Sequence, residues 1–171
     1  MGLNLEAPIL NFAEAHTRLL MKPTATLEDA ILLAVQAHRG QRDKAGAPYV
    51  LHVLRVMLQM PDDTTRMAAV LHDVVEDTPH TLDDLRAAGF TEDVISAVDA
   101  LTRRADETYK AFVRRAGGHP VARRIKLADL EDNMDTRRLP RLTERDESRL
   151  QRYRDAWALL RGEEDAADPN G

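Results

Sequence analysis

The chain has 171 residues, a formal net charge of −5 and no cysteine, and 43% of its residues are hydrophobic. This length suits one domain over residues 1–171, with enough chain for a hydrophobic core. The lack of cysteine excludes disulfides and thiolate zinc sites, and the acidic balance argues against broad nucleic-acid binding but not against a small anionic substrate.

No apolar run reaches the roughly 18 residues of a membrane helix, and the N-terminus shows no signal-peptide pattern. We therefore expect a cytoplasmic protein that does not bind membranes.

The spacing of apolar residues and the helix-capping residues predict a succession of short helices. A capping box at Thr26–Asp29 opens one of them, and Asp63 or Thr64 is expected to cap the helix that carries His72 and Asp73. In the first half of the chain the helices are expected at about 5–21, 27–40, 48–58 and 64–77.

The second half follows the same pattern. Its helices are expected to begin near Thr81, Thr91, Tyr109, His119 or Pro120, and Thr143. The last, at about 144–161, carries an apolar stripe that we expect to lie in the core or on a homodimer surface, and the tail 163–171 is expected to be frayed. Alternating β-type runs and internal repeats are absent, so the sequence predicts an all-α bundle of roughly eight to ten helices.

Four candidate metal ligands lie in apolar stretches of predicted helices, where a charged group is costly unless it is paired or binds a metal. Two histidine nitrogens with carboxylate oxygens suit Mn²⁺, Fe²⁺, Zn²⁺ or Co²⁺. Glu76 and Asp77 follow one helical turn later, and from there a carboxylate can orient or deprotonate a water beside the ion. The candidate ligands are His52, His72, Asp73 and Asp129.

These patterns also have plain structural explanations. A lone histidine on an apolar helix face is more often a core residue than a ligand. Glu76 and Asp77 can form a solvated helix end, although acidic residues there oppose the helix dipole. His38 either caps its helix or hydrogen-bonds an acid of the site. Spacing alone leaves both interpretations open.

Three motifs in order resemble the HD-superfamily hydrolase domain, in particular the RelA/SpoT-type (p)ppGpp hydrolase domain and its small single-domain relatives. The similarity covers about residues 26–140. The motifs are His38-x-Gly40-Gln41-x-x-Lys44-x-Gly46-x-Pro48-Tyr49-x-x-His52, Leu71-His72-Asp73-Val74-Val75-Glu76-Asp77-Thr78, and Lys126-Leu127-Ala128-Asp129-x-x-x-Asn133-Met134-x-Thr136.

The resemblance implies an all-α HD fold with one divalent metal, usually Mn²⁺, on the four candidate ligands. It implies that Glu76 and Asp77 place a metal-activated nucleophilic water, and that the reaction removes the 3′-pyrophosphate of guanosine tetra- or pentaphosphate. Lys44, Asn133 and Thr136 occupy nucleotide-contacting positions. No synthetase segment is visible, so the resemblance implies a hydrolase only.

Several positions depart from the family pattern. Asp43 stands where the family usually has an arginine, with Arg42 as a candidate substitute one residue earlier. The residues Leu130, Asp132 and Asp135 replace Arg, His and Arg of the third motif. An acid in place of arginine replaces a bidentate anion donor with a repelling charge, although Arg137, Arg138 and Arg141 could supply phosphate contacts from shifted positions.

Three functions therefore stay open. The first is hydrolysis of a guanosine 3′-pyrophosphate. The second is phosphohydrolysis of a different nucleotide or phosphorylated small molecule. The third is a metal- and nucleotide-binding module without turnover, which the retention of Glu76 and Asp77 argues against.

Overall fold

The computed structural model describes residues 24–139 and 141–162. Over these residues the regular elements are all helices, apart from an isolated bridge between Arg42 and Pro48, so the all-α prediction is confirmed. The predicted helix at 5–21 and the tail 163–171 lie outside the described residues. The helices are α2 (Leu27–Ala37), α3 (Val50–Leu58), α4 (Asp63–Leu71), α5 (Val74–Asp77), α6 (Leu82–Ala88), α7 (Glu92–Leu101), α8 (Tyr109–Gly117), α9 (Pro120–Met134), the 3₁₀ helix η1 (Thr136–Arg138) and α10 (Glu144–Arg161).

Capping residues set most of the helix starts. Thr26, Thr81 and Thr143 each form a capping box with an aspartate three residues later, as their spacing predicts. The expected cap of α4 is wrong by one or two residues, because the side chain of Asp62 accepts the hydrogen bond from the Thr65 amide.

The predicted helix through His72 and Asp73 is interrupted at those two residues. The helix α4 ends at Leu71, and α5 begins at Val74. The backbone dihedrals of His72 (φ −58°, ψ −33°) and Asp73 (φ −97°, ψ −5°) stay close to helical values, which explains why the apolar period continues across the break. The interruption places a histidine and an aspartate at a junction between two helices.

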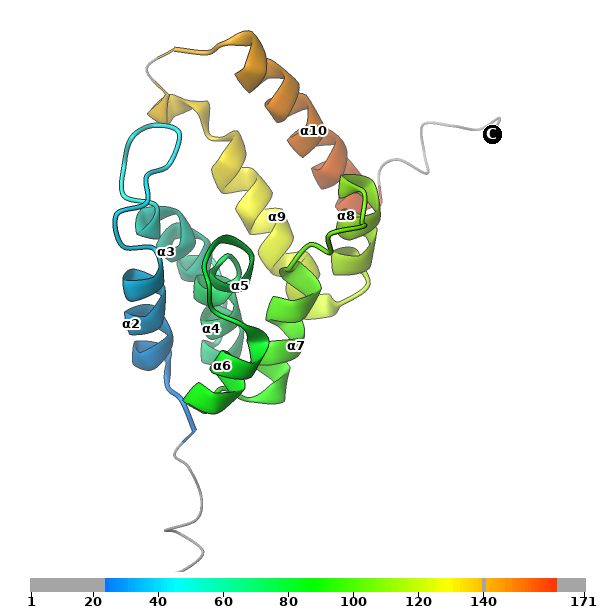
Figure 1. Ribbon diagram of the computed structural model, residues 1–171. Helices are drawn as coiled ribbons and strands as arrows, with labels where there is room; N and C mark the ends of the chain where they lie inside the picture. Colours follow the sequence, from blue (N-terminus) through cyan, green and yellow to red (C-terminus); the bar gives the residue numbers. More distant parts are fainter. Residues whose placement is uncertain (1–23, 140, 163–171) are drawn as a thin grey trace, which may run out of the picture.

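The helices pack around two apolar clusters that share α9. The larger cluster takes buried side chains from α2, α3, α4, α6 and α7 together with Ile125 of α9, and the smaller one joins α8 and α10 to Leu130 of α9. Figure 1 shows α9 running through the molecule, with α10 along one side and α3 and α4 along the other. Since α9 touches both clusters, it holds the two parts of the bundle together.

The apolar stripe of α10 lies in the smaller cluster. Leu160 is buried there, and Tyr153 and Trp157 pack against it while the Trp157 indole nitrogen donates to Glu131 at 3.1 Å. None of the described helices combines the length and the apolar character that crossing a membrane requires.

Leu130→Ala is expected to lower the free energy of unfolding by about 2–5 kcal/mol, because truncation of this fully buried side chain leaves a cavity. Leu58→Ala is the matched control: its side chain is 73% exposed, and its effect is expected to stay within about 0.5 kcal/mol. Urea unfolding of both variants measures this, and equal effects would contradict the packing of α9 against α8 and α10.

Candidate metal centre and pocket

Four predicted ligands from separate parts of the chain converge in the structure. His52 comes from α3, His72 and Asp73 from the junction before α5, and Asp129 from α9. The Nε2 atom of His52 lies 3.2 Å from Asp129 Oδ1 and 3.6 Å from Asp73 Oδ2. The Nε2 atom of His72 lies 3.1 Å from Asp73 Oδ2 and 3.8 Å from Asp129 Oδ1. His52, His72 and Asp73 together form a group whose ligand atoms all lie within 4.8 Å of one another.

The chemistry of this cluster fits a divalent cation. Within the described part of the chain, Nε2 of His52 and of His72 is buried and has no hydrogen-bond partner. Burial alone lowers the pKa of His52, but the Asp129 and Asp132 carboxylates beside its ring outweigh it and raise the pKa to about 9. A divalent ion can replace that proton, because a coordinating imidazole must be neutral. The nitrogen and carboxylate donors suit Mn²⁺, Fe²⁺, Co²⁺ or Zn²⁺.

The two candidate carboxylate ligands are held by further side chains. Asp129 Oδ2 accepts from the Lys126 amine at 2.7 Å, and its Oδ1 accepts from the Asn133 amide at 2.5 Å. Asp73 Oδ2 accepts from the Tyr49 hydroxyl at 2.6 Å. Burial raises the pKa of Asp129, but the Lys126 charge and the neighbouring histidines outweigh it and hold that pKa well below the ordinary value. Burial likewise raises the pKa of Asp73, but the charge of His72 outweighs it and holds that pKa below its ordinary value, so both carboxylates are ionised and oriented.

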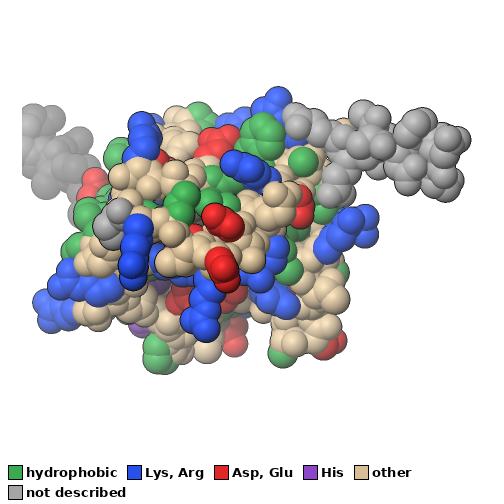
Figure 2. Space-filling view, turned by 90° about the horizontal axis from the view of Figure 1, so that it is seen from above, with side chains coloured by type: hydrophobic (Ala, Val, Ile, Leu, Met, Phe, Trp, Pro, Cys, Tyr) green, Lys and Arg blue, Asp and Glu red, His purple; other side chains and the backbone are tan. Residues whose placement is uncertain are grey.

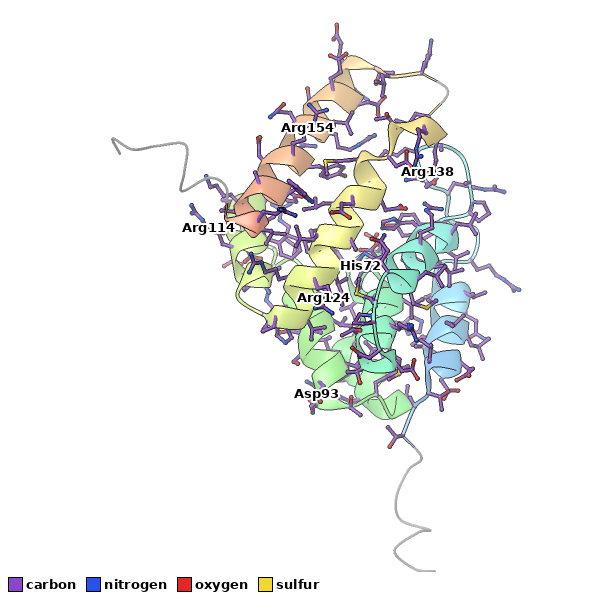
Figure 3. The ribbon with its side chains drawn as sticks, turned by 180° about the vertical axis from the view of Figure 1, so that it is seen from behind. His72, Asp93, Arg114, Arg124, Arg138 and Arg154 are labelled. Atoms are coloured by element: carbon purple, nitrogen blue, oxygen red, sulfur yellow. The ribbon has the colours of Figure 1, made fainter. Side chains whose placement is uncertain are left out.

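The ring orientation of each candidate histidine ligand is fixed through Nδ1. His72 Nδ1 lies 2.7 Å from the Ala69 carbonyl oxygen, and His52 Nδ1 lies 2.7 Å from Asp132 Oδ2. Figure 3 shows His72 among the helices at the centre of the molecule. In both residues the Nδ1 contact leaves Nε2 to face the carboxylates, the arrangement of a metal-binding histidine.

A pocket of about 410 Å³ opens over this cluster. Glu76 and Asp77, the predicted catalytic pair, line it, and so do the predicted substrate contacts Arg42, Lys44 and Asn133. Figure 2 shows the face seen from above, where Lys and Arg side chains surround acidic ones. The residues that line the pocket combine the carboxylates of Asp73, Asp129, Glu76 and Asp77 with basic groups that can meet phosphate.

The remaining predicted residues lie farther out. Thr136 begins η1 and is not among the described residues that line the pocket. His38 occupies the C-cap of α2, and its Nδ1 lies 2.8 Å from Gln41 Oε1. Of its two predicted roles, the structure shows the position at the helix end and, among the described residues, no hydrogen bond to an acid of the site. Gln41 in turn donates to the Asp77 carbonyl oxygen at 3.3 Å, and His38 therefore reaches the segment of the predicted catalytic pair through one intervening side chain.

Several pocket residues were not assigned to the site from the sequence. Arg103 follows α7, Tyr109 and Phe112 come from α8, and Arg149 and Tyr153 come from α10. In the sequence, the α10 residues carried no signal beyond an amphipathic stripe. Only the docking of α10 beside α9 brings them to the pocket.

The carboxylate of Asp43 is neutralised by its surroundings. Its Oδ1 accepts from the Ala45 and Ala47 amides at 2.9 Å each, and its Oδ2 accepts from Arg138 at 2.9 Å. The repulsion of an anionic substrate that we expected from this position is accordingly offset by a guanidinium. Arg138 is occupied by this contact, whereas exposed Arg137 pairs with Asp135.

The segment between α7 and α8 positions Glu76. The Arg103 amide donates to Glu76 Oε2 at 3.2 Å. Arg115 stabilises this segment, since it donates to the Thr102 carbonyl at 2.9 Å and pairs with Glu107 at 2.8 Å. The Glu107–Arg115 pair therefore acts on Glu76 through the backbone of the segment.

Glu107→Gln is expected to lower the melting temperature at neutral pH, and the loss is expected to shrink in acid. The hydrogen bond with Arg115 lowers the pKa of Glu107 from 4.5 to about 2. A depressed folded-state pKa contributes stability that is fully present above about pH 4.5 and is lost as the pH falls through about 2. Thermal unfolding of both proteins between about pH 7 and pH 2.5 measures this, and a constant difference in melting temperature would contradict it.

Known proteins resemble this chain in sequence and in fold. The sequence profile of the HD domain family matches residues 30–138. The chain belongs to the HD domain family. This confirms the family to which the three motifs point, and the HD-domain residues 30–138 contain all four candidate ligands and the Glu76–Asp77 pair.

Two relatives and one solved structure define the surrounding branch. The HD chain is 38% identical over 125 residues to a GTP pyrophosphokinase of Streptomyces coelicolor, covering 66% of this chain and 15% of that protein. It is 30% identical over 122 residues to a guanosine-3′,5′-bis(diphosphate) 3′-pyrophosphohydrolase of Aquifex aeolicus, covering 64% of this chain and 17% of that protein. The solved structure, described as a metazoan ortholog of SpoT that hydrolyses ppGpp, has a TM-score of 0.64 and 27% identity and covers 82% of this chain and 87% of that one. The chain thus spans less than a fifth of the length of the two curated relatives but most of the solved structure.

Proposed function

We propose that this chain is a metal-dependent phosphohydrolase that removes the 3′-pyrophosphate of guanosine 3′,5′-bis(diphosphate), with Mn²⁺ as the preferred ion. The convergence of four ligands under a pocket that also holds Glu76 and Asp77 carries this proposal. The relatives named as 3′-pyrophosphohydrolases and the solved ppGpp hydrolase support it.

His52, His72, Asp73 and Asp129 would hold the ion. When bound, it supplies Lewis-acid activation of water and of a phosphoryl oxygen. Lys126 and Asn133 keep Asp129 in place, and Tyr49 does the same for Asp73, so the ligand atoms are organised before substrate enters.

Glu76 and Asp77 divide the proton transfers. Glu76, held by the Arg103 amide, orients the attacking water and accepts its proton. Partial burial and the charges of Asp73 and Glu76 raise the pKa of Asp77. A carboxyl group with a raised pKa can hold a proton and deliver it to the departing 3′ oxygen, which needs one as the phosphorus–oxygen bond breaks.

Basic residues that line the pocket receive the nucleotide phosphates. Lys44 and Arg149 both line the pocket. Burial lowers the pKa of Lys44, and the nearby charge of Arg149 lowers it further. Two neighbouring cations of this kind can form charge-assisted hydrogen bonds with a bound anion, which stabilises them more than solvent alone. The overall charge of −5 is compatible with an anionic substrate because these charges are local.

A second candidate is hydrolysis of another phosphorylated nucleotide. Arg42, the substitute for the missing family arginine, already donates to the Gly46 carbonyl at 3.1 Å, and Asp43 occupies the usual arginine position. The substrate contact that the resemblance implies at this position is therefore altered in this chain.

Incubation with Mn²⁺ and a panel of nucleotides tests both candidates, with released pyrophosphate and nucleotide products separated by anion-exchange chromatography. Conversion of guanosine 3′,5′-bis(diphosphate) to GDP and pyrophosphate is expected. Release only from a nucleotide without a 3′-pyrophosphate would replace the first candidate by the second. No release from any member of the panel, with metal bound, would leave a binding module.

A further inference from the structure

The side chain of Asp132 is buried and receives hydrogen bonds from three other side chains. His52 Nδ1 lies 2.7 Å from Oδ2, Arg55 donates to Oδ1 at 2.5 Å and to Oδ2 at 3.0 Å, and Arg138 donates to Oδ2 at 3.2 Å. A buried carboxylate is costly unless it is paired, and two guanidinium groups offset its charge. The two guanidinium groups therefore hold the Asp132 carboxylate in place beside the His52 imidazole.

This contact controls how His52 presents its other nitrogen. An imidazole that donates Nδ1–H to a carboxylate keeps its lone pair on Nε2 and cannot rotate without losing the hydrogen bond. Here Nε2 points to Asp129 and Asp73, at 3.2 Å and 3.6 Å. A carboxylate partner also makes the imidazole a stronger donor to a metal than a neutral partner would.

The same network reaches the pocket loop, which we define as residues 41–49. Arg138 donates to Asp43 Oδ2 at 2.9 Å and to the Asp132 carbonyl oxygen at 2.6 Å. Asp43 in turn closes the loop by accepting from the Ala45 and Ala47 amides. Figure 3 shows Arg138 on η1, at the end of the bundle where this loop lies. One guanidinium thus joins the loop that carries Lys44 to the carboxylate that holds His52.

We propose that Asp132 is a positioning residue for His52, and that Arg138 couples the pocket loop to it. Metal affinity and the position of the pocket loop are then linked. When Arg138 holds the loop, it also keeps the Asp132 carboxylate aligned with the His52 imidazole. This inference rests on the metal site of the proposed function, but it concerns residues outside the ligand set. It gives Asp43 and Asp132, two departures from the family pattern, a joint role.

Optical titration with Co²⁺ tests the first half of this inference, because the ligand-field absorption of Co²⁺ reports both affinity and geometry. Asp132→Asn keeps the shape and one acceptor oxygen but removes the charge. We expect it to weaken Co²⁺ binding about 10–100-fold and to change the absorption spectrum. Thermal unfolding of each sample confirms that the protein is folded, and Asp132→Glu, which restores the charge, is expected to recover part of the affinity.

The second half is tested with Arg138→Met against Arg137→Met. Arg137 is the matched control, since it is 88% exposed and pairs with Asp135 rather than with this network. Arg138→Met is expected to weaken Co²⁺ binding about 3–30-fold, the range of a coupling through one intervening contact, and Arg137→Met to leave it within about two-fold. Asp43→Asn, which keeps the loop-closing acceptor, is expected to add little to Arg138→Met because both act through the same contact.

The outcomes separate this inference from the proposed function. If the wild-type protein binds Co²⁺ and Asp73→Ala does not, the metal site stands. Unchanged affinity and spectrum in Asp132→Asn would then overturn the positioning role alone, and equal effects of the two arginine variants would overturn the coupling to the loop. If Co²⁺ binding does not depend on Asp73, both the metal site and this inference fall.

Discussion

Asp73→Ala is expected to abolish metal binding and, with it, hydrolysis. Asp73 Oδ2 lies 3.1 Å and 3.6 Å from the Nε2 atoms of His72 and His52, so its removal takes a charged donor from the centre of the ligand cluster. Loss of an outer residue that orients a ligand already costs 10–100-fold in metal affinity, and loss of the ligand itself is expected to cost more than about 100-fold. Isothermal titration with Mn²⁺ measures the affinity.

Asp83→Ala is the matched control for this experiment. Asp83 carries the same side chain at the start of α6, where it is 91% exposed and pairs with Arg86. Its Mn²⁺ affinity and turnover are expected to equal those of the wild type. Tight Mn²⁺ binding by Asp73→Ala would mean that the ion binds elsewhere.

Glu76→Gln is expected to retain metal binding but to lower the rate of hydrolysis. The amide has the shape of the carboxylate and can still accept from the Arg103 amide, but it cannot take a proton from water. Positioned general bases contribute about 10²–10⁴-fold to rate, so kcat is expected to fall by that factor while the Mn²⁺ affinity changes by less than about three-fold. Steady-state kinetics with saturating Mn²⁺, together with calorimetry, measure the two quantities.

Glu92→Gln serves as the control for the second experiment, because Glu92 is exposed and pairs with Arg86 away from the pocket. It is expected to leave kcat unchanged. Undiminished turnover in Glu76→Gln would remove the assigned base, and a parallel loss of metal would mean that Glu76 is a ligand instead.

Local signals explain most of what could be predicted. A capping box needs only residues three apart, so Thr26, Thr81 and Thr143 could be placed with their helices. The break between α4 and α5 was missed because the apolar period runs through it. Its functional consequence, a histidine and an aspartate side by side at a helix junction, was still visible as the pair His72-Asp73.

Contacts between distant residues explain most of what could not be predicted. Asp132 was taken as a departure from the family pattern, but in the structure it holds His52 across 80 residues of sequence. Asp43 was expected to repel substrate, but Arg138, 95 residues later, neutralises it. The sequence does not show which basic side chain will pair with a given acidic residue, because the packing of the helices decides that partner.

The amino-acid sequence by itself determined the all-α class, the candidate ligands and the carboxylate pair that follows them, since each depends on residue type and on spacing within one helix or motif. The tertiary structure alone decided that α10 contributes to the pocket, that the four ligands face one another, and that Asp43 and Asp132 are joined through Arg138. The physical reason is that coordination, burial and ion pairing depend on distances in space. Only the packing of α3 and α9 against α4, and of α10 against α9, fixes those distances.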